Sequence, residues 1–357
     1  MIPLCQPRAT TPGAATGGGG HKAARRRWRL AAALVCVAGA LLGGLGHPGG
    51  ASQPAGADRA PFEFALMGDA PYSALEEIAF EAMMGEIDRA GLAFVVHVGD
   101  FKSSRMPCSD ELFGKRLALF QRSAHPFVFV FGDNEWTDCH LPAAGGYDPV
   151  ERLARLRELF AANDQSLGRR TMTLERQSAA ARWAKFRENV RWRRGGVVFV
   201  GLNIPGSNNN LGRTRAGNAE YTERNAADLA WMEDSFTVAI ERGAVGILLA
   251  IQADPYFELA RGHPRRSGYE SFLAGLERQT ARFARPVVLV HGDSHVFRID
   301  RPLVDATGRR VENLTRVEVF GSPVVSWVRG RVVPDSASVF SFEPEPSEPR
   351  RGESSPR

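Results

Sequence analysis

The chain has 357 residues, 43% of them hydrophobic, which is enough to bury one large core. Its formal net charge of +5 is unevenly spread. Residues 1–50 contain six Lys or Arg and no Asp or Glu, which leaves 39 basic and 40 acidic residues in the remainder. This nearly neutral remainder has no basic stripe with interleaved aromatic residues, which argues against a nucleic-acid partner.

The first 60 residues are predicted to be a signal peptide or anchor followed by a linker. A basic cluster at residues 25–29 precedes an apolar run over residues 30–46, and Ala55-Gly56-Ala57 offers a cleavage site. An uncleaved membrane anchor is the alternative, because the run is at the short limit for spanning a bilayer. We therefore expect a periplasmic or secreted protein, or one held at a membrane only through its N-terminal segment.

Residues 61–342 are predicted to form one domain. The last stretch, residues 343–357, contains mainly Pro, Glu, Ser and Arg and almost nothing apolar, so a disordered tail is expected there.

Six short apolar runs within the domain are predicted to be buried strands, since they are rich in Val, Ile and Phe and are flanked by glycine. Each run is followed by a side chain of a type that binds ligands. The runs are residues 62–67, 93–98, 127–131, 197–202, 245–251 and 287–290, and the residues that follow them include Asp69, Asp100, Asp133, Asn203, Gln252 and His295.

Helical patterns separate several of these runs. Ser73 is expected to cap the first helix, with Glu76 three residues on. One face of that helix is predicted from Leu75, Ile78, Ala79, Ala82 and Ile87. Further helices are expected from Ser109, from Asp148-Pro149, over 219–239 and over 269–284, and residues 148–194 are interpreted as a helical insertion. The alternation of strands and helices indicates an α/β fold with a largely parallel sheet, in which ligands bind beyond the carboxyl ends of the strands.

Acidic side chains at such an edge suit a pair of divalent cations. Two cations about 3.5–4 Å apart need a bridging carboxylate and further oxygen or imidazole ligands. They lower the pKa of bound water and stabilise charge on a phosphoryl group under attack. Glycine beside a ligand lets the backbone turn sharply, so that the carboxylate points into the site.

At these residues the sequence resembles the calcineurin-like metallophosphoesterase family, which includes the purple acid phosphatases. The matching motifs are Gly68-Asp69, Gly99-Asp100, Gly132-Asp133-Asn134-Glu135, Gln252 before Pro255, and Gly292-Asp293-Ser294-His295. The resemblance covers residues 61–325 and implies a four-layer α/β/β/α sandwich with two central mixed sheets. It also implies a metal-dependent hydrolase of phosphate esters that uses a metal-activated hydroxide at a carboxylate-rich dinuclear site.

The resemblance implies a set of six metal ligands in which Asp100 bridges both cations. The set is Asp69, Asp100, Asp133, Gln252, Asp293 and His295. Several of these positions hold histidine in the family, and an imidazole-poor set favours Mg²⁺, Mn²⁺, Ca²⁺ or iron over zinc. Two alternatives remain open, namely Asn134 in place of Asp133 and Asp254 in place of Gln252.

The catalytic positions implied by the resemblance are Asn134 and Glu135. Asn134 stands where the family has a histidine, so it can donate a hydrogen bond but no proton, and Glu135 is the candidate acid. Lys102, His291 and Asn203 are candidates for contacts with substrate or with the ligands. The expected substrate is a phosphorylated small molecule or a lipid-derived phosphate ester.

Cys108 and Cys139 follow the second and third motifs, in loops that leave what the resemblance implies are neighbouring strands. Because export places the chain in an oxidising compartment, we expect a disulfide between them, and two separate buried thiols are the alternative.

The missing family histidines leave a second hypothesis for the function. The chain would then be a secreted non-catalytic binding protein on a degenerate metallophosphoesterase scaffold. The retained carboxylates oppose this hypothesis, because clustered carboxylates repel one another without a cation.

Overall fold

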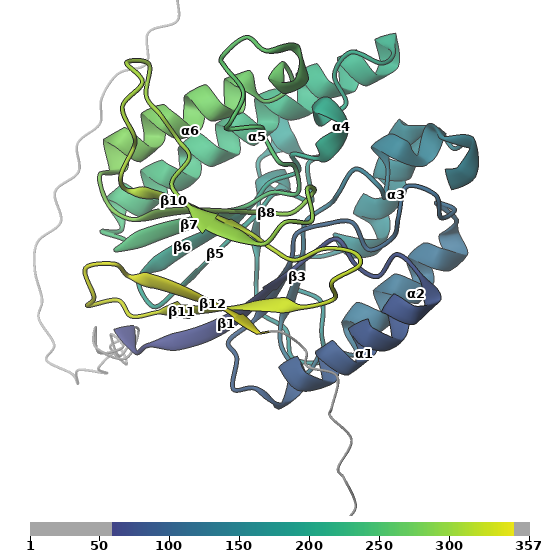
Figure 1. Cartoon of the computed structure of the whole chain (residues 1–357), viewed down its shortest axis with the longest axis horizontal. Helices are drawn as coiled ribbons and strands as arrows, with labels where there is room; N and C mark the ends of the chain where they lie inside the picture. Colours follow the sequence, from purple (N-terminus) through teal and green to yellow (C-terminus); the bar gives the residue numbers. More distant parts are fainter. Residues whose placement is uncertain (1–58, 346–357) are drawn as a thin grey trace, which may run out of the picture. The chain divides into compact units, whose positions relative to one another are not determined.

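The structure of the protein is a computed structural model that describes residues 59–345. The predicted cleavage site and nearly all of the predicted leader, together with residues 346–357, lie outside the described residues. Two mixed sheets stack on each other, and helices cover their outer faces (Figure 1). The four-layer sandwich implied by the sequence is therefore confirmed.

The first sheet contains three parallel strands that were predicted and two antiparallel strands that were not. In sheet order they are β12 (Phe340–Glu345), β11 (Trp327–Val332), β1 (Phe62–Met67), β2 (Val95–His97) and β3 (Phe127–Phe129). Strands β1, β2 and β3 run parallel, whereas β11 and β12 form an antiparallel ribbon on the other side of β1.

The second sheet is built around four parallel strands, with antiparallel strands at both edges. In sheet order they are β4 (Glu175–Arg176), β5 (Val190–Arg194), β6 (Val197–Gly201), β7 (Gly246–Ala250), β8 (Val287–His291), β10 (Leu314–Glu318) and β9 (Arg298–Asp300). All six predicted strands are present, and each ends within a few residues of its predicted end.

The five predicted helices are present, with the predicted caps. They are α1 (Ala74–Arg89), α2 (Asp110–Gln121), α3 (Pro149–Phe160), α5 (Arg215–Glu241) and α6 (Glu270–Phe283). The side chains of Ser73, Ser109 and Asp148 accept hydrogen bonds from the first turns of α1, α2 and α3, which satisfies backbone N–H groups that have no partner within the helix. A short element, α4 (Gly206–Asn209), was not predicted.

Three apolar layers hold the sandwich together. The central layer joins the facing sheets through residues such as Phe64, Phe94, Phe199 and Val288. The outer face of the first sheet packs on α1, α2 and α3, and the outer face of the second packs on α5 and α6. Because strands with both faces covered are buried throughout, they appear in the sequence as continuous apolar runs.

Three sequence expectations are corrected by the structure. Residues 148–194 are helical mainly over α3, and their last five residues form β5 in the second sheet. Glu343–Glu345 belong to β12, so the ordered chain extends past residue 342. The buried residues of α1 are Phe80, Met83, Met84 and Ile87, whereas Leu75, Ile78, Ala79 and Ala82 are exposed.

No helix within residues 59–345 is long and apolar enough to cross a membrane.

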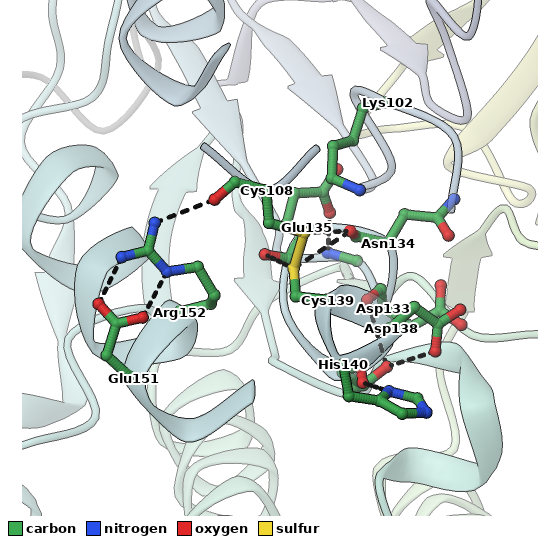
Figure 2. Close-up of a disulfide and its surroundings, with 12 residues drawn as sticks. Lys102, Cys108, Asp133, Asn134, Glu135, Asp138, Cys139, His140, Glu151 and Arg152 are labelled. Atoms are coloured by element: carbon green, nitrogen blue, oxygen red, sulfur yellow. Dashed lines mark hydrogen bonds and ion pairs between the residues drawn. A yellow bond between two sulfur atoms is a disulfide. The ribbon is translucent and has the colours of Figure 1, made fainter. Parts of the chain in front are cut away.

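The disulfide expected from the sequence joins Cys108 and Cys139 (Figure 2). Both cysteines are fully buried, and the bridge lies beside Asn134 and Glu135, with Arg152 on its other side. Arg152 donates a hydrogen bond from Nη1 to the Cys108 carbonyl oxygen at 3.0 Å. The bridge spans 31 residues, and closing a loop of that size stabilises the fold by about 3–4 kcal/mol. It fixes the loop after β2 to the short helix Thr137–His140, next to Asp133 and Asn134.

Candidate active site at the carboxyl edge of both sheets

The carboxyl ends of the parallel strands in both sheets meet at one edge of the sandwich. Asp69 follows β1 in the first sheet, and Asp293 follows β8 in the second. The backbone N–H of Asp293 donates to both carboxylate oxygens of Asp69, at 3.1 Å each. A Cβ on Gly292 would lie 2.0 Å from Asp69 Oδ2, so this close approach requires glycine. The structure thus brings together side chains that are separated by more than 200 residues.

Asp100 is at the centre of the cluster. Its Oδ1 accepts a hydrogen bond from the Asn134 backbone N–H at 3.1 Å. Its Oδ2 accepts from Asn134 Nδ2 at 2.7 Å, from the Tyr72 hydroxyl at 3.1 Å and from Gln252 Nε2 at 3.3 Å. All these groups are donors, so the Asp100 carboxylate is a shared acceptor at the centre of the cluster.

Asp133 and Asp293 approach each other across Gly206, the first residue of α4. A Cβ at residue 206 would lie 2.6 Å from Asp133 Oδ2 and 2.8 Å from Asp293 Oδ1. The Gly206 backbone N–H donates to Gln252 Oε1 at 2.5 Å, and the Asp133 backbone N–H donates to the same oxygen at 3.3 Å. Gln252, predicted as a ligand, is fully buried, with its amide oxygen bound to these two N–H groups and its amide nitrogen donating to Asp100 Oδ2 at 3.3 Å.

Asp254, the alternative to Gln252, faces away from this centre. Its backbone N–H donates to Asp293 Oδ2 at 2.9 Å, while its carboxylate accepts from the Tyr256 backbone N–H and lies near Arg298. Of the two alternatives, the geometry favours Gln252 as the side chain directed into the cluster.

His295 is the imidazole of the cluster. Its Nδ1 lies 2.7 Å from the Ser322 carbonyl oxygen, which fixes the proton on Nδ1. Its Nε2 lies 3.4 Å from the Tyr72 hydroxyl and 3.9 Å from Asp69 Oδ1, and in the neutral imidazole this nitrogen carries the lone pair. This orientation is the one that a metal-binding histidine requires.

Several ligand residues have backbone angles that are uncommon for residues other than glycine. The φ angles are +49° at Asp69, +61° at Asp100, +76° at Asp293 and +61° at His295. Such conformations cost free energy and persist where the surrounding structure holds them, which occurs often at functional sites. The turn after each strand therefore directs the side chain into the cluster rather than along the strand.

Burial and mutual repulsion raise the pKa of the clustered carboxyl groups. Burial is the largest cause for Asp69, Asp100 and Asp293, and neighbouring carboxylates raise the pKa of each further, well above its ordinary value. Burial, with repulsion from Asp138, raises the pKa of Asp133 to about 6. The folded chain therefore lacks enough positive charge to stabilise all of these groups in their ionised form.

Glu135 was predicted as a catalytic acid, but its carboxylate is bound to backbone N–H groups. Its carboxylate accepts hydrogen bonds from the backbone N–H groups of Asp100, Phe101 and Gly132, at 3.1, 2.5 and 2.9 Å. Burial raises its pKa to about 7, although Lys102 and these three donors oppose the rise. Glu135 joins the loops after β2 and β3 and so holds two ligand-bearing turns in place.

Lys102 is fully buried beside the cluster, with Nζ donating to the Ser103 carbonyl oxygen at 3.1 Å. Burial lowers its pKa, while attraction to Glu135, Asp100 and other nearby carboxylates opposes that change. It supplies one positive charge to a site that contains several negative ones.

The other two candidate contact residues point away from the cluster. The Asn203 side chain donates to Glu188 Oε1 at 3.1 Å, within a buried polar network on the insertion side. His291 is buried with Nδ1 on the Gly292 carbonyl oxygen at 2.8 Å, and burial lowers its pKa to about 4. His97 is also buried in the core, between the Ala70 carbonyl oxygen and the Gly99 N–H.

Two residues at the cluster were not predicted as site residues. The Tyr72 hydroxyl donates to Asp100 and accepts from Asn134 Nδ2 at 3.0 Å, so it lies among three candidate site groups. Ser207 Oγ lies 2.8 Å from Asp133 Oδ2 and 2.7 Å from Asp138 Oδ1. Tyr72 follows the first motif by three residues, at the end of the same turn, which is the only sequence signal for its role.

The donors suit hard divalent cations by their chemistry, because they are carboxylate and amide oxygens with one imidazole. The arrangement of these donor atoms differs from the arrangement of ligands around a bound metal ion. Within residues 59–345, no three His, Cys, Asp or Glu side chains already present their ligand atoms as a metal site. The carboxylate oxygens instead accept hydrogen bonds from N–H and O–H groups of the same cluster, and a cation would replace some of these donors.

No protein-family profile matches the chain, and no curated protein matches it. Solved structures that resemble it include a dimetal phosphatase from Danio rerio, at 13% identity and a TM-score of 0.47, covering 79% of this chain and 95% of that one. A 5'-nucleotidase from Candida albicans and a purple acid phosphatase from yellow lupin each have 10% identity and a TM-score of 0.42. The match covers 79% of this chain in both cases but only 50% and 53% of theirs. The three structures are, by their names, two phosphatases and a nucleotidase.

Proposed function

We propose that the protein is a divergent calcineurin-like metallophosphoesterase that hydrolyses phosphate esters with two divalent cations. The observation that carries this proposal is the cluster of four aspartates from both sheets, three of them buried and Asp293 half-buried, whose pKa values are raised by burial and by neighbouring carboxylates. The six residues that would hold the cations are Asp69, Asp100, Asp133, Gln252, Asp293 and His295. Their oxygen-rich chemistry supports Mg²⁺, Mn²⁺, Ca²⁺ or iron rather than zinc.

When bound, the cations would activate a water molecule and neutralise charge on the phosphoryl group. The chain's own residues then have separate tasks. Asn134 Nδ2, which now donates to Asp100 and Tyr72, can turn to a phosphoryl oxygen. Lys102 adds positive charge from within the fold, and Glu135 keeps the turns around Asp100 and Gly132 in register.

We assign to Tyr72 the role of proton donor. Asn134, which stands where the family has a histidine, can donate a hydrogen bond but no proton. The Tyr72 hydroxyl already lies at hydrogen-bond distance from Asp100 and Asn134, on an otherwise half-buried side chain. A phenol can donate a proton to a departing alkoxide, which Asn134 cannot do. This role supports turnover despite the missing family histidine.

The alternative function is a secreted binding protein that holds cations or phosphate without turnover. One observation favours it: His97 and His291 lie away from the cluster, each bonded to backbone groups, so neither replaces the missing family imidazoles.

A metal-dependent phosphoesterase assay separates these two functions. The full chain is stripped with a chelator, reloaded with Mn²⁺, and tested for phosphate release from a panel of phosphate esters. We expect activity that depends on Mn²⁺, and Tyr72→Phe is expected to lower kcat about 100-fold with little change in KM, because it removes a proton donor and no charge. If Tyr72→Phe releases phosphate with the same kcat as the wild type, the role assigned to Tyr72 is contradicted. Cation binding with no release from any ester would favour the binding protein.

We also infer that the protein is exported. The predicted leader and the disulfide, a bond that persists mainly in oxidising compartments, support this inference.

A further inference from the structure

The chain after β6 contains four consecutive residues in the left-handed region of backbone angles. The φ angles are +50° at Ser207, +55° at Asn208, +56° at Asn209 and +64° at Asn210. Residues other than glycine enter this region at a cost in free energy and normally one at a time, and asparagine enters it more readily than most. We call residues 207–210 the left-handed turn. Such a turn persists only where neighbouring groups hold it.

The left-handed turn begins beside three of the proposed cation ligands, namely Asp133, Gln252 and Asp293. The Ser207 hydroxyl lies 2.8 Å from Asp133 Oδ2, and the Gly206 backbone N–H donates to Gln252 Oε1 at 2.5 Å. A Cβ added to Gly206 would lie 2.8 Å from Asp293 Oδ1. Under the proposed function these three side chains bind the same cation, so the position of the turn affects the spacing of its ligands.

The ligands proposed for the other cation are held by different groups. The Asp69 carboxylate accepts hydrogen bonds from the Asp293 backbone N–H, and His295 Nδ1 lies 2.7 Å from the Ser322 carbonyl oxygen. Neither contact involves the left-handed turn. A change in the turn is therefore expected to affect one cation more than the other.

Arg224 of α5 holds the buried side of the left-handed turn, and its own side chain is fully buried. Its Nη1 donates to Asn209 Oδ1 at 2.6 Å, and its Nη2 donates to the Asn209 carbonyl oxygen at 3.0 Å. Nη1 also donates to the Asn203 carbonyl oxygen at 2.7 Å, just after β6. The guanidinium carbon lies 5.2 Å from the centroid of the Trp136 ring, which directly follows the third motif. One side chain thus joins the turn to the loop that carries Asp133.

Arg213 holds the exposed side of the left-handed turn. Its Nη2 donates to Asn210 Oδ1 at 3.2 Å and to the Thr137 carbonyl oxygen at 2.7 Å, and its Nη1 lies 3.1 Å from Asp138 Oδ1. Thr137 and Asp138 belong to the short helix that follows the third motif, and Figure 2 shows Asp138 next to Asp133. The turn is therefore joined to the segment of Asp133 from both sides.

We infer that Arg224 and Arg213 are positioning residues, which hold the left-handed turn against the segment of Asp133 and so fix the ligand geometry at one of the two cation sites. This inference rests on the proposed function, because that function supplies the cations. Arg224 also pairs with Glu220 and Asp228, at 2.7 and 3.3 Å, but these partners lie on its own helix and do not contact the third motif. The bonds to the turn need the guanidinium group, because its donors point in fixed directions.

Arg224→Lys and Arg213→Lys test this inference without changing the net charge near the cations. Lysine has a single ammonium group and cannot reproduce the fork of hydrogen bonds to the turn. A neutral substitute would by itself favour cation binding, because it removes a repulsive positive charge, and this gain would mask the loss of positioning. Arg215→Lys, at the exposed arginine that begins α5, is the matched control.

The measurement is Mn²⁺ titration of the full chain, followed by electron paramagnetic resonance. We expect the wild type and Arg215→Lys to bind two Mn²⁺ ions whose spectra show magnetic coupling, as ions about 3.5–4 Å apart do. In Arg224→Lys the dissociation constant of one Mn²⁺ is expected to rise at least about 10-fold, while that of the other stays within about threefold. Arg213→Lys is expected to change the same constant in the same direction. Anomalous scattering from variant crystals with limiting Mn²⁺ should give the weaker peak beside Asp133 and Asp293.

The outcomes separate this inference from the proposed function. Equal weakening of both Mn²⁺ ions in the two lysine variants, or no weakening of either, would overturn the positioning role, and Mn²⁺-dependent ester hydrolysis by the wild type would leave the phosphoesterase function standing. Selective loss of one Mn²⁺ in a protein that hydrolyses no ester would support the positioning role and overturn the phosphoesterase function. A wild type that binds no Mn²⁺ would overturn both. If circular dichroism shows that Arg224→Lys is unfolded, Arg213→Lys decides, because Arg213 is exposed.

Discussion

Asp100→Asn is expected to lower kcat/KM for phosphate-ester hydrolysis at least about 1,000-fold, since a metal contributes several kcal/mol to transition-state stabilisation. The wild-type carboxylate accepts hydrogen bonds from Asn134, Tyr72 and Gln252, and all of these groups are donors. An amide nitrogen at residue 100 would face other donors, and the central negative charge of the cluster would be lost. Cation binding is expected to weaken together with activity.

The measurement is steady-state kinetics together with Mn²⁺ titration of the same two proteins. Asp335→Asn is the matched control, because Asp335 is exposed and its nearest basic partner, Arg59, is 3.8 Å away. The control is expected to match the wild type in both measurements. Activity and Mn²⁺ affinity in Asp100→Asn within about threefold of the wild type would contradict the assignment of Asp100.

The metal-free protein is expected to lose several kcal/mol of stability as the pH rises from about 4 to above 7. This direction is expected because the carboxyl groups with raised pKa values outweigh the buried His97 and His291, whose lowered pKa values act in the opposite direction below about pH 6.5. In the folded chain the pKa is raised to about 6 for Asp133 and to about 7 for Glu135, and it is raised further above its ordinary value for Asp69, Asp100 and Asp293. The folded state thus holds protons that the unfolded state releases near pH 4. The stabilisation from these protons is complete below the unfolded pKa values and is lost as pH rises through the folded ones.

Urea unfolding at about pH 5 and about pH 8, in the presence of a chelator or Mn²⁺, measures this dependence. We expect the chelated protein to be less stable at the higher pH and Mn²⁺ to restore the loss, because the cation replaces the protons as the counter-charge. Asp228 distinguishes the pH dependence that a cation removes from the pH dependence that it leaves unchanged. Burial raises its pKa to about 7 as well, but it lies beside Arg224 and away from the cluster, so its part of the pH dependence should persist with Mn²⁺. A chelated protein that becomes more stable with rising pH would contradict the raised pKa values.

The strand ends were predictable from sequence because burial on both faces produces continuous apolar runs. Those runs ended next to Asp69, Asp100 and Asp133, so the acidic edge followed from the chain order. Strands β9 to β12 were not predicted, since a strand such as β11 contains two arginines and a glycine and so forms no continuous apolar run. Their pairing depends on contacts between residues far apart in the chain.

The buried face of α1 could not be settled from periodicity alone. The helix carries two apolar stripes, one through Leu75 and Ile78 and one through Phe80 and Met84. Hydrophobic spacing fits both of them, and the larger aromatic and Met side chains fill the core. Tyr72 and Ser207 were missed for a related reason, because hydroxyl groups become site residues only through the turns that place them beside Asp100 and Asp133.

Anomalous X-ray scattering from crystals grown with Mn²⁺ would locate the cations directly. The proposed function predicts two peaks, both next to Asp100, with Asp69 and His295 at one and Asp133, Gln252 and Asp293 at the other. A map with no peak at the carboxyl edge of the two sheets, or with Mn²⁺ bound only elsewhere, would contradict it.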